Sequence, residues 1–248
     1  MLLSARRLLD YKIEATDGNI GHADSFLFDD QTWIIRYLVI DTGKWLSGRK
    51  VLLAPSVLGK PVADQRVFPI SLTRQEIEAS PDIDTDKPIS RQHEVQLYEY
   101  YDWTPYWGGG VAMPYAPFAG VEKRQTERQA VQVEERFDQH LRSTKEIIGY
   151  KIHAKDGKMG HIDDFIVEEY EWIIRHLIVD TRSWLPSRSV IIPPEWIKEI
   201  RWMESEVYVD VSKDEVKESP EFNPEAPVNR EYETRLYDYY GRPKYWMR

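Results

Sequence analysis

The residues best spaced for chemistry are two histidine–aspartate pairs. His22 is followed two residues later by Asp24, and His161 is followed two residues later by Asp163. Residues i and i+2 of a strand point to the same face, so each pair places an imidazole beside a carboxylate, as metal sites do. Two ligands are too few for a zinc site, and the spacing fixes no third ligand. We therefore interpret both pairs as structural or solvated residues and expect no bound metal.

The rest of the chain carries no recognisable reaction centre. It contains no catalytic-triad ordering, no phosphate-binding loop and no dinucleotide-binding fingerprint. Asp41 and Asp180 each precede a threonine at the end of a predicted strand, and an Asx turn accounts for both of them. We expect no catalytic residue, no cofactor and no enzymatic activity.

Composition narrows the class of protein further. A chain of 248 residues has room for two domains of about 100–150 residues each. The absence of cysteine excludes disulfide scaffolds and thiol catalysis. The net charge of −9 argues against a nucleic-acid-binding function, because affinity for phosphate comes from lysine and arginine.

No apolar run approaches the roughly 18 residues of a membrane span, and the start has no signal-peptide core. We expect a cytoplasmic protein without a transmembrane segment.

The chain repeats itself at a shift of 139 residues. Residues 4–107 align with 143–246 without a gap, and 35 of these 104 positions are identical. A period of this length indicates a duplicated domain rather than a solenoid. We predict two domains, 1–107 and 143–248. They are joined by 108–142, a segment rich in glycine and proline at first and then charged, as linkers are.

Short strands and tight turns dominate each copy. After a helical turn that Ser4 or Ser143 would cap, the first copy has predicted strands at 11–15, 20–28, 33–40, 51–53 and 67–72. The third strand has few polar breaks, so we expect it to be central, with Ile35 and Ile174 buried. Capping boxes at Thr73 and Ser212 predict a short helix. A last helix follows, and the expected N-caps of that helix are Ser90 and Asn229.

The expected fold is mainly β, with two tandem small β-barrels, short helices and an aromatic C-terminal tail on each copy. Several short strands joined by tight turns in about 75 residues favour a closed barrel. Closure also removes the exposed edges of a small sheet. The copies should match, with Trp33 on Trp172 and Asp41 on Asp180.

The motifs resemble those of the PRC-barrel family. They are the hairpin at 17–26 (Asp-Gly-x-x-Gly-x-x-x-x-Phe), the strand and turn at 39–53 (Val-Ile-Asp-Thr-Gly-x-Trp-Leu) and the later Ser-Leu-Thr-Arg. The resemblance covers roughly 4–80 and 143–219. The Tyr-Trp tail is similar to that of bacterial stand-alone proteins of this type. The family includes the cytoplasmic domain of the photosynthetic reaction-centre H subunit and the C-terminal domain of RimM. The resemblance implies a β-barrel used for protein contacts.

Two groups of residues are candidates for a partner surface. The turn after the central strand carries Trp45 and Arg49, matched by Trp184 and Arg188. Aromatic residues and arginine are enriched at interfaces, but the favoured interpretation is a tryptophan that packs over the barrel end.

The aromatic tails of the two copies form the second group. The candidate surface residues in the tails are Tyr98, Tyr101, Trp107, Tyr237, Tyr240 and Trp246. Tails this apolar are unfavourable in water, so we predict that 97–107 and 236–246 pack on barrel surface, within the chain or across a dimer. Reciprocal packing between the copies is the favoured form. A partner-binding surface is the alternative.

The favoured function is a non-enzymatic protein-interaction or scaffold module of the bacterial PRC-barrel type. It would have a protein partner of open identity, and a homodimer also stays open. One alternative is an H-subunit-like accessory to a membrane electron-transfer complex, in particular a photosynthetic one. A second alternative is small-ligand binding between the two barrels, because clefts between domains are common ligand sites.

Overall fold

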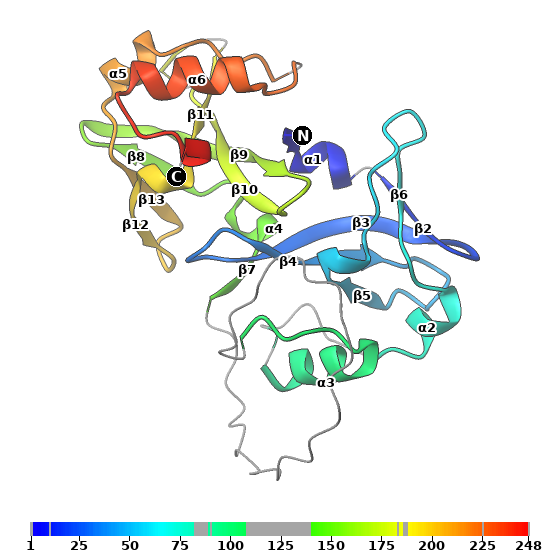
Figure 1. The fold of residues 1–248 in the computed structure, drawn as a ribbon. Coiled ribbons are helices and arrows are strands. Elements are labelled where there is room, and N and C mark those ends of the chain that lie inside the picture. The colour runs from blue at the N-terminus through cyan, green and yellow to red at the C-terminus, as the bar shows by residue number, and fades with distance from the viewer. Residues whose placement is uncertain are drawn as a thin grey trace. The chain divides into compact units, whose positions relative to one another are not determined.

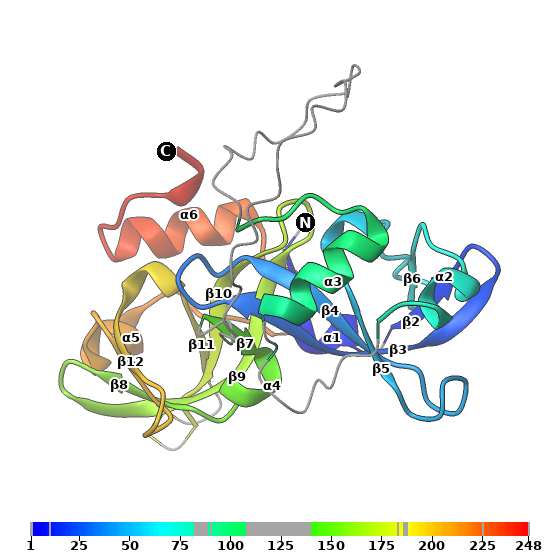
Figure 2. The same ribbon diagram turned by 90° about the horizontal axis from the view of Figure 1, so that it is seen from below.

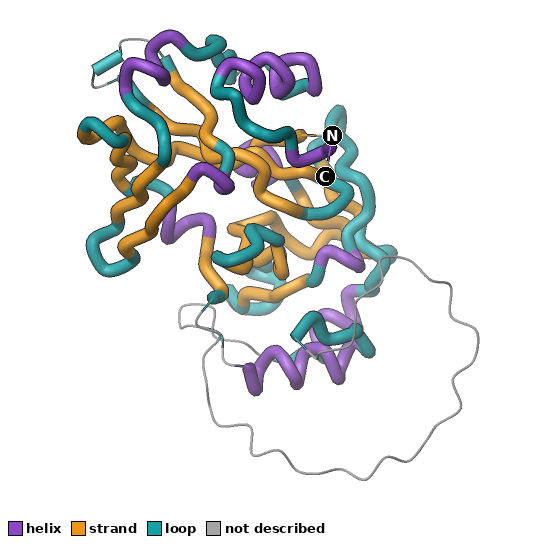
Figure 3. The backbone as a smooth tube through the Cα atoms, turned by 60° about the vertical axis from the view of Figure 1, so that its left-hand side comes forward, coloured by secondary structure: helices purple, strands orange, loops and turns teal. Residues whose placement is uncertain are grey.

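The computed structural model describes residues 2–9, 11–81, 89, 91–107, 140–182, 184–185, 188–224 and 226–247. The chain divides into two compact units. Unit 1 contains Met1–Glu78 and His140–Arg248, and unit 2 contains Ala79–Gln139. Strands make up much of unit 1, which holds the sheets of both sequence copies (Figures 1 and 3). We call Met1–Glu78 the first half of unit 1 and His140–Arg248 its second half.

The predicted domain boundaries at 107 and 143 stay predictions. The predicted linker, 108–142, lies outside the described residues except for its last three positions, 140–142.

The first half of unit 1 consists of strands and short helices. Its strands are β1 (Leu2–Ser4), β2 (Lys12–Ala15), β3 (Gly18–Asp29), β4 (Ile35–Asp41), β5 (Lys50–Leu53) and β6 (Val67–Pro69). Its helices are α1 (Ala5–Leu9), η1 (Pro55–Val57) and α2 (Arg74–Glu78). The strand order is β5-β4-β3-β2-β6, in which β2 and β6 are parallel and the other neighbours are antiparallel.

The second half repeats this order. Its strands are β7 (Leu141–Ser143), β8 (Lys151–Ala154), β9 (Gly157–Glu168), β10 (Ile173–Asp180), β11 (Ser189–Ile192), β12 (Ile197–Arg201) and β13 (Glu206–Val209). Its helices are α4 (Thr144–Ile147), η2 (Pro194–Trp196), α5 (Lys213–Glu218), α6 (Arg230–Tyr239) and η3 (Tyr245–Met247). The order β11-β10-β9-β8-β13-β12 matches the first half strand for strand except for β12, so the predicted correspondence between the copies is confirmed for the strand order. Figure 2 shows strands of both halves.

Strand β12 has a reduced counterpart in the first half. Two isolated bridges, Leu58 with Ile70 and Val62 with Val67, occupy the positions that correspond to the ends of the β12–β13 ladder. Between them lies Pro61, which cannot donate a backbone hydrogen bond. The ladder is therefore interrupted in the first half and continuous in the second.

The hydrogen bonding does not close either sheet into a barrel. Among the described residues, no ladder joins β5 to β6 or β11 to β12. The mainly β fold with short helices is confirmed, but the predicted closure is not found. The edges are instead short: β5 and β11 have four residues each, and a bridge between Ser189 and Phe222 covers part of β11. Short edge strands limit unwanted pairing without closure.

The first strand of each half pairs with the sheet of the other half. Strand β1 lies antiparallel to β9, with Leu2 opposite Glu168 and Ser4 opposite Ile166. Strand β7 lies antiparallel to β3, with Ser143 opposite Leu27. These registers are equivalent under the 139-residue shift. The two halves therefore exchange their first strands reciprocally.

Matched ion pairs accompany the exchanged strands. Arg6 Nη2 lies 3.0 Å from Asp163 Oδ1, and at the corresponding positions Lys145 Nζ lies 2.5 Å from Asp24 Oδ1. The aspartates of the two His-x-Asp motifs thus hold the exchanged segments, which is a structural role for both of them.

A second set of contacts joins the halves at Trp33 and Trp172. The Ile35 N–H donates to the Trp172 carbonyl at 2.7 Å, and the Ile174 N–H donates to the Trp33 carbonyl at 2.9 Å. Both tryptophans have a left-handed backbone, with φ of 60° and 53°. Left-handed φ is uncommon for a bulky residue and here aims the two carbonyls across the junction.

The aromatic core is continuous between the halves. The Phe26 ring lies 6.1 Å from the Trp172 ring, and the Phe68 ring lies 6.0 Å from it. Phe28 lies between Trp33 at 5.1 Å and Phe165 at 6.3 Å. The four phenylalanines of this core are fully buried. The halves therefore share one core and form one compact unit.

The close approach of neighbouring strands explains one glycine of the repeated hairpin. A Cβ atom on Gly21 would collide with the Asp41 carbonyl, and a Cβ atom on Gly160 would collide with the Asp180 carbonyl. These contacts are to backbone, which has little room to yield. Glycine at this position is therefore required by packing in both halves.

Most of the predicted helix caps are present. Ser143 accepts from the Lys145 N–H at 3.2 Å, and Ser212 forms a reciprocal capping box with Glu215. Thr73 exchanges the same two bonds with Glu76, and Asn229 caps α6. The predicted cap Ser90 lies outside the described residues.

Unit 2 contains helix α3 (Arg91–Tyr101) and the tail that follows it. Within this unit, the Tyr98 ring contacts the rings of three residues, Trp103, Tyr106 and Trp107, with centroids 4.7–6.2 Å apart. The tail therefore folds back onto its own helix.

The buried central strands give a first prediction. Ile35 and Ile174 are 2 % and 1 % exposed, which confirms their expected burial. Truncation of either residue to alanine should lower the free energy of unfolding by about 2–5 kcal/mol, because it removes buried methyl groups and leaves a cavity. Denaturant unfolding would measure this loss. Losses below about 1 kcal/mol at both positions would contradict the described packing.

The strand exchange gives a second prediction. Facing Cα atoms of antiparallel strands lie within the reach of a disulfide. The variant Leu2→Cys/Glu168→Cys should therefore oxidise within one chain, and the native chain has no cysteine to compete. Non-reducing electrophoresis should show a monomer with altered mobility. Leu2→Cys/Lys158→Cys, a pair from the same two strands out of register, is the control. Oxidation of both pairs only between chains would contradict the exchange.

Candidate functional site

The turn that follows β4 in the first half and β10 in the second half holds a half-buried tryptophan under a cation. The Arg74 guanidinium lies 4.7 Å from the centre of the Trp45 ring, and the Lys213 ammonium lies 4.7 Å from that of Trp184. Arg74 and Lys213 are equivalent positions of the repeat. The Trp184 indole N–H also donates to the Met159 carbonyl. Each indole is thus packed on one side and partly accessible to solvent. This matches both the packing interpretation of the turn and the partner-surface interpretation.

The arginine of each turn connects it to a later helix, α2 in the first half and α5 in the second. Arg49 Nη1 donates to the Glu78 carbonyl at 3.1 Å, and Arg188 Nη1 donates to the equivalent Lys217 carbonyl at 2.6 Å. Arg188 Nη2 also donates to the Ser219 carbonyl. Both arginines are half-buried. Their main role in the described structure is to position the turn.

The two predicted Asx turns are present. The Asp41 carboxylate accepts from the Gly43 N–H at 2.8 Å, and the Asp180 carboxylate accepts from the Arg182 N–H at 2.9 Å. The threonine after each aspartate donates to the carbonyl of the turn arginine, at 2.5 Å for Thr42 and 2.8 Å for Thr181. These bonds fix the shape of both turns.

The paired histidines are exposed and lie within β3 and β9, where His22 is opposite Asp41 and His161 is opposite Asp180. His161 Nε2 lies 3.8 Å from Asp180 Oδ2, whereas its sequence neighbour Asp163 is bound to Arg6. Among the described residues, no group of three or more histidine, aspartate and glutamate side chains is arranged to hold a metal ion.

The tail of the second half packs on its own sheet. The Tyr240 ring lies 4.6 Å from Trp196, and the Arg175 guanidinium of β10 lies 4.3 Å from the Tyr245 ring. The prediction that tails pack on the fold is confirmed here, but reciprocal packing is wrong for this tail. The reason is that the first strands, not the tails, exchange between the halves.

The candidate surface residues of this tail differ in how deeply they are buried. Tyr237 is fully buried, so this tyrosine does not belong to an accessible surface. Burial also raises the pKa of Tyr240 to about 12, so that phenol is neutral at physiological pH. Trp246 is half-buried beneath the Arg230 guanidinium at 4.1 Å.

The sequence interpretation missed a buried acid–base cluster at this tail. Glu233 and His176 are 1 % and 0 % exposed, and His176 Nε2 lies 2.9 Å from Glu233 Oε1. The Tyr245 hydroxyl donates to the same oxygen at 2.9 Å. In unit 2 the equivalent Tyr106 donates to Glu94 at 2.7 Å. The identical glutamate and tyrosine, twelve residues apart in both copies, were a signal for this contact.

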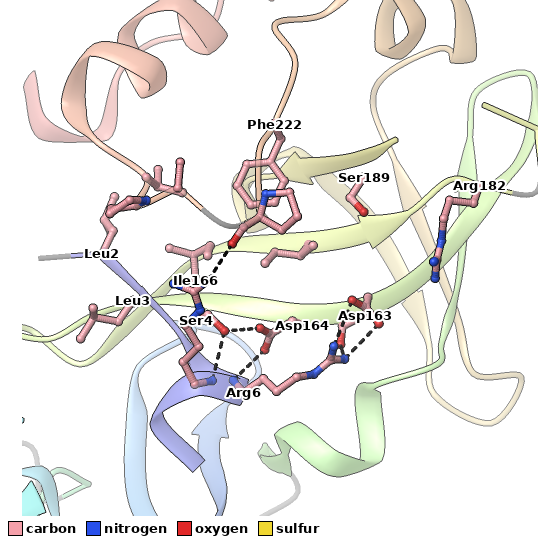
Figure 4. Close-up of a pocket in the computed structure, with 16 residues that line it drawn as sticks. Leu2, Leu3, Ser4, Arg6, Asp163, Asp164, Ile166, Arg182, Ser189 and Phe222 are labelled. Carbon is pink, nitrogen blue, oxygen red and sulfur yellow. Dashed lines mark hydrogen bonds and ion pairs between the residues drawn. The ribbon is translucent and has the colours of Figure 1, made fainter. Parts of the chain in front are cut away.

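A groove of about 690 Å³ lies between the exchanged strand β1 and the second half (Figure 4). Its apolar lining comes from β1, from the sheet and from the segment at 222–228. The residues of this lining are Leu2, Leu3, Ile166, Ile178, Phe222, Pro224, Ala226, Pro227 and Val228. Its polar lining is Ser4, Arg6, Arg7, Asp163, Asp164, Arg182 and Ser189.

Hydrogen bonds order the polar part of the groove. The Ser4 hydroxyl donates to Asp164 Oδ2 at 2.5 Å, and the Arg6 N–H donates to Asp164 Oδ1 at 3.0 Å (Figure 4). Asp164 is 5 % exposed, and burial raises the pKa of its carboxyl above the ordinary value despite these two donors. The Arg182 guanidinium is bound to Asp180 and stays 68 % exposed.

No protein-family model matches this chain, and no curated protein matches it. In the described residues, no helix has the length and apolar character needed to cross a membrane.

The buried aspartate gives a third prediction, about pH. Because the pKa of Asp164 is raised above 3.8 in the folded chain, the folded state keeps this proton after the unfolded state has lost it. The free energy of unfolding should therefore fall as pH rises through that interval. When the free energy of unfolding is measured with urea between pH 4 and 7, the variant Asp164→Asn should lack the part of the decrease that Asp164 causes.

The control for this prediction is Asp64→Asn, which changes an exposed aspartate in the first half. That variant should keep the wild-type pH dependence. Identical pH profiles for the wild type and Asp164→Asn would contradict the raised pKa.

Proposed function

We propose that this protein is a non-enzymatic scaffold that binds a protein partner through its two tryptophan turns. The observation that carries the proposal is the matched construction of these turns. Trp45 and Trp184 are both half-buried, and each lies under a cation at the same position of the repeat, Arg74 or Lys213. In each turn an arginine also donates to a carbonyl of α2 or α5. Aromatic residues beside arginine are favoured at protein interfaces.

The interlocked halves support a bivalent form of binding. Exchanged strands and a shared aromatic core hold both turns on one unit, so two contacts with the same partner become one linked event. A partner that presents two copies of one motif suits this arrangement. Each single contact is then free to be weak while the combined affinity is high.

We also propose that each half is related to the PRC-barrel family. Support comes from residues of the resemblance that have defined places in both halves. Asp17 and Asp156 accept backbone N–H bonds from the start of the following helix, at 2.7 and 2.9 Å. Gly21 and Gly160 permit the close strand approach, and Asp41 and Asp180 shape the turn.

A second candidate function, ligand binding between the halves, is favoured by the groove beside β1. Its volume of about 690 Å³ lies within the usual range of roughly 300–1,000 Å³ for ligand sites. It combines apolar walls with a few ordered polar groups, as such sites do.

The scaffold proposal is tested with the variant Trp45→Ala/Trp184→Ala. Affinity capture from native lysate, quantified by mass spectrometry, should lose proteins that the wild type enriches. Each single variant should keep part of the capture, because one contact remains. The expected loss for the double variant is tenfold or more, since two aromatic hot spots of about 2 kcal/mol each are removed.

The matched control is Trp202→Ala, which removes a half-buried tryptophan that also lies under an arginine, 4.2 Å from Arg142, but outside the turns. Thermal unfolding confirms that all variants fold. Capture that is unchanged in the double variant, or lost equally in the control, would overturn the proposal.

A further inference from the structure

We propose that each tryptophan turn binds an acidic side chain of the protein partner, with a neighbouring aromatic ring of that partner against the indole. This inference rests on the proposed scaffold function and specifies the partner's chemistry at the same two turns. Two observations carry it. A cation without a counter-charge lies beside each indole, and both copies of the repeat keep a positive charge at this position.

The cation beside each indole has no carboxylate partner. Arg74 and Lys213 are half-buried, and each side chain lies over the tryptophan ring of its turn. Within the described part of the chain, neither side chain forms an ion pair, and Arg74 Nε is buried without a hydrogen-bond partner. Partial removal of a charge from water costs free energy unless an opposite charge compensates for it. A carboxylate on the partner would supply that compensation.

An aspartate of the preceding hairpin binds the backbone at each cation rather than its side chain. Asp17 Oδ1 accepts from the Arg74 N–H at 2.7 Å, and Asp156 Oδ1 accepts from the Lys213 N–H at 2.9 Å. These N–H groups, which begin α2 and α5, are therefore occupied. The proposed contact uses the side-chain cations and not the ends of the two short helices.

The two copies keep the charge of this position but not its residue type. Arg74 carries a planar guanidinium, whereas Lys213 carries a compact ammonium, and the two groups differ in hydrogen-bonding geometry. Both nevertheless lie 4.7 Å from the centre of an indole. The property in common is a positive charge beside an aromatic ring. Attraction of a carboxylate depends on that charge rather than on the shape of the group.

The arginine of the second turn adds to its positive charge. Arg188 donates to the carbonyls of Lys217 and Ser219, which are neutral, so these bonds do not cancel the charge of the guanidinium. Among the described residues, Arg188 forms no ion pair. Lys213 and Arg188 thus give this turn two cations without a bound carboxylate.

The indole provides the other part of the contact. Trp45 and Trp184 are half-buried, and the Trp184 N–H donates to the Met159 carbonyl, which holds the ring in place. An aromatic side chain next to the acidic one would pack against the accessible part of the indole, in the offset or edge-to-face geometry that ring pairs favour. A ring that is already held loses little freedom on binding.

A protein carboxylate suits these turns better than a nucleic-acid phosphate. Binding to nucleic acid draws on many lysine and arginine side chains that follow the phosphate backbone. The net charge of this chain is −9, and the repeat places one cation beside each indole. One cation beside one aromatic ring matches a single acidic side chain with a neighbouring ring.

The test uses the full chain and three labelled six-residue probes in fluorescence anisotropy. The acidic probe alternates aspartate and tyrosine, and in the neutral and basic probes asparagine or lysine replaces the aspartate. The acidic probe should bind roughly 2–5-fold more tightly than the neutral probe, which is the ratio that one accessible ion pair supplies. It should bind at least about tenfold more tightly than the basic probe, because the cations attract one and repel the other.

Charge reversal locates the site. The variant Arg74→Glu/Lys213→Glu should bind the basic probe more tightly than the acidic probe, which reverses the order of the wild type. A lost packing contact would weaken both probes alike and would not reverse their order. Glutamate is favourable in the first turn of a helix, so the variant should fold, and thermal unfolding checks this. Arg74→Gln/Lys213→Gln, a milder change, should bind the acidic and neutral probes equally.

The matched control is Lys12→Glu/Lys151→Glu, which makes the same change of charge at equivalent exposed positions of β2 and β8, outside the turns. It should keep the wild-type order of the three probes. The carboxylate contact is overturned if the acidic probe does not bind, if Arg74→Glu/Lys213→Glu keeps the wild-type order, or if the control reverses it too. Tighter binding of a labelled single-stranded oligonucleotide than of the acidic probe would also overturn the assignment to a protein.

The outcomes separate this inference from the scaffold proposal. If the probes fail while lysate capture still depends on Trp45 and Trp184, the scaffold proposal stands and the carboxylate contact alone is rejected. Capture that does not depend on these tryptophans would instead reject the scaffold proposal itself.

Discussion

The exchange of first strands between the two halves is the interaction on which unit 1 depends. Each exchanged strand contributes three residues, too few to be stable alone, so it forms when both sheets are present. The carbonyls of Trp33 and Trp172 complete the junction. A non-glycine residue in the left-handed region costs on the order of 1–3 kcal/mol, and such strain persists where the surroundings determine it. Here a reciprocal pair of hydrogen bonds and a shared aromatic core fix both residues.

This junction positions the two candidate binding surfaces, the tryptophan turns and the groove. It holds the turns of Trp45 and Trp184 on one body, and it brings β1 against the second half to form the groove. One of the two ion pairs that secure the exchange, Arg6 with Asp163, also lines that groove. The strand exchange and the groove beside β1 thus share residues.

Differences between the copies distinguish residues that maintain the fold in both halves from residues that act in one half alone. Positions that hold the fold keep their contacts in both halves, as Gly21 with Gly160 and Asp41 with Asp180 show. The replacement of Ser25 by Asp164 gives the second half a buried carboxylate. Such a group costs free energy unless it gains donors, and Ser4 and the Arg6 N–H provide two. Differences of this kind give the second half its own chemistry.

The sequence by itself determined the duplication, the hairpins, the Asx turns, the helix caps and the buried inner strands, because each follows from local periodicity or from a turn residue. It did not determine barrel closure, which is not found, or the pairing of β1. A three-residue strand has no periodic signal, and Ser4 meets Asp164 across 160 positions of the chain. The pairing of Glu233 with His176 likewise depends on where α6 docks. Tertiary structure decided these contacts, since they need edges and faces that exist only after both sheets form.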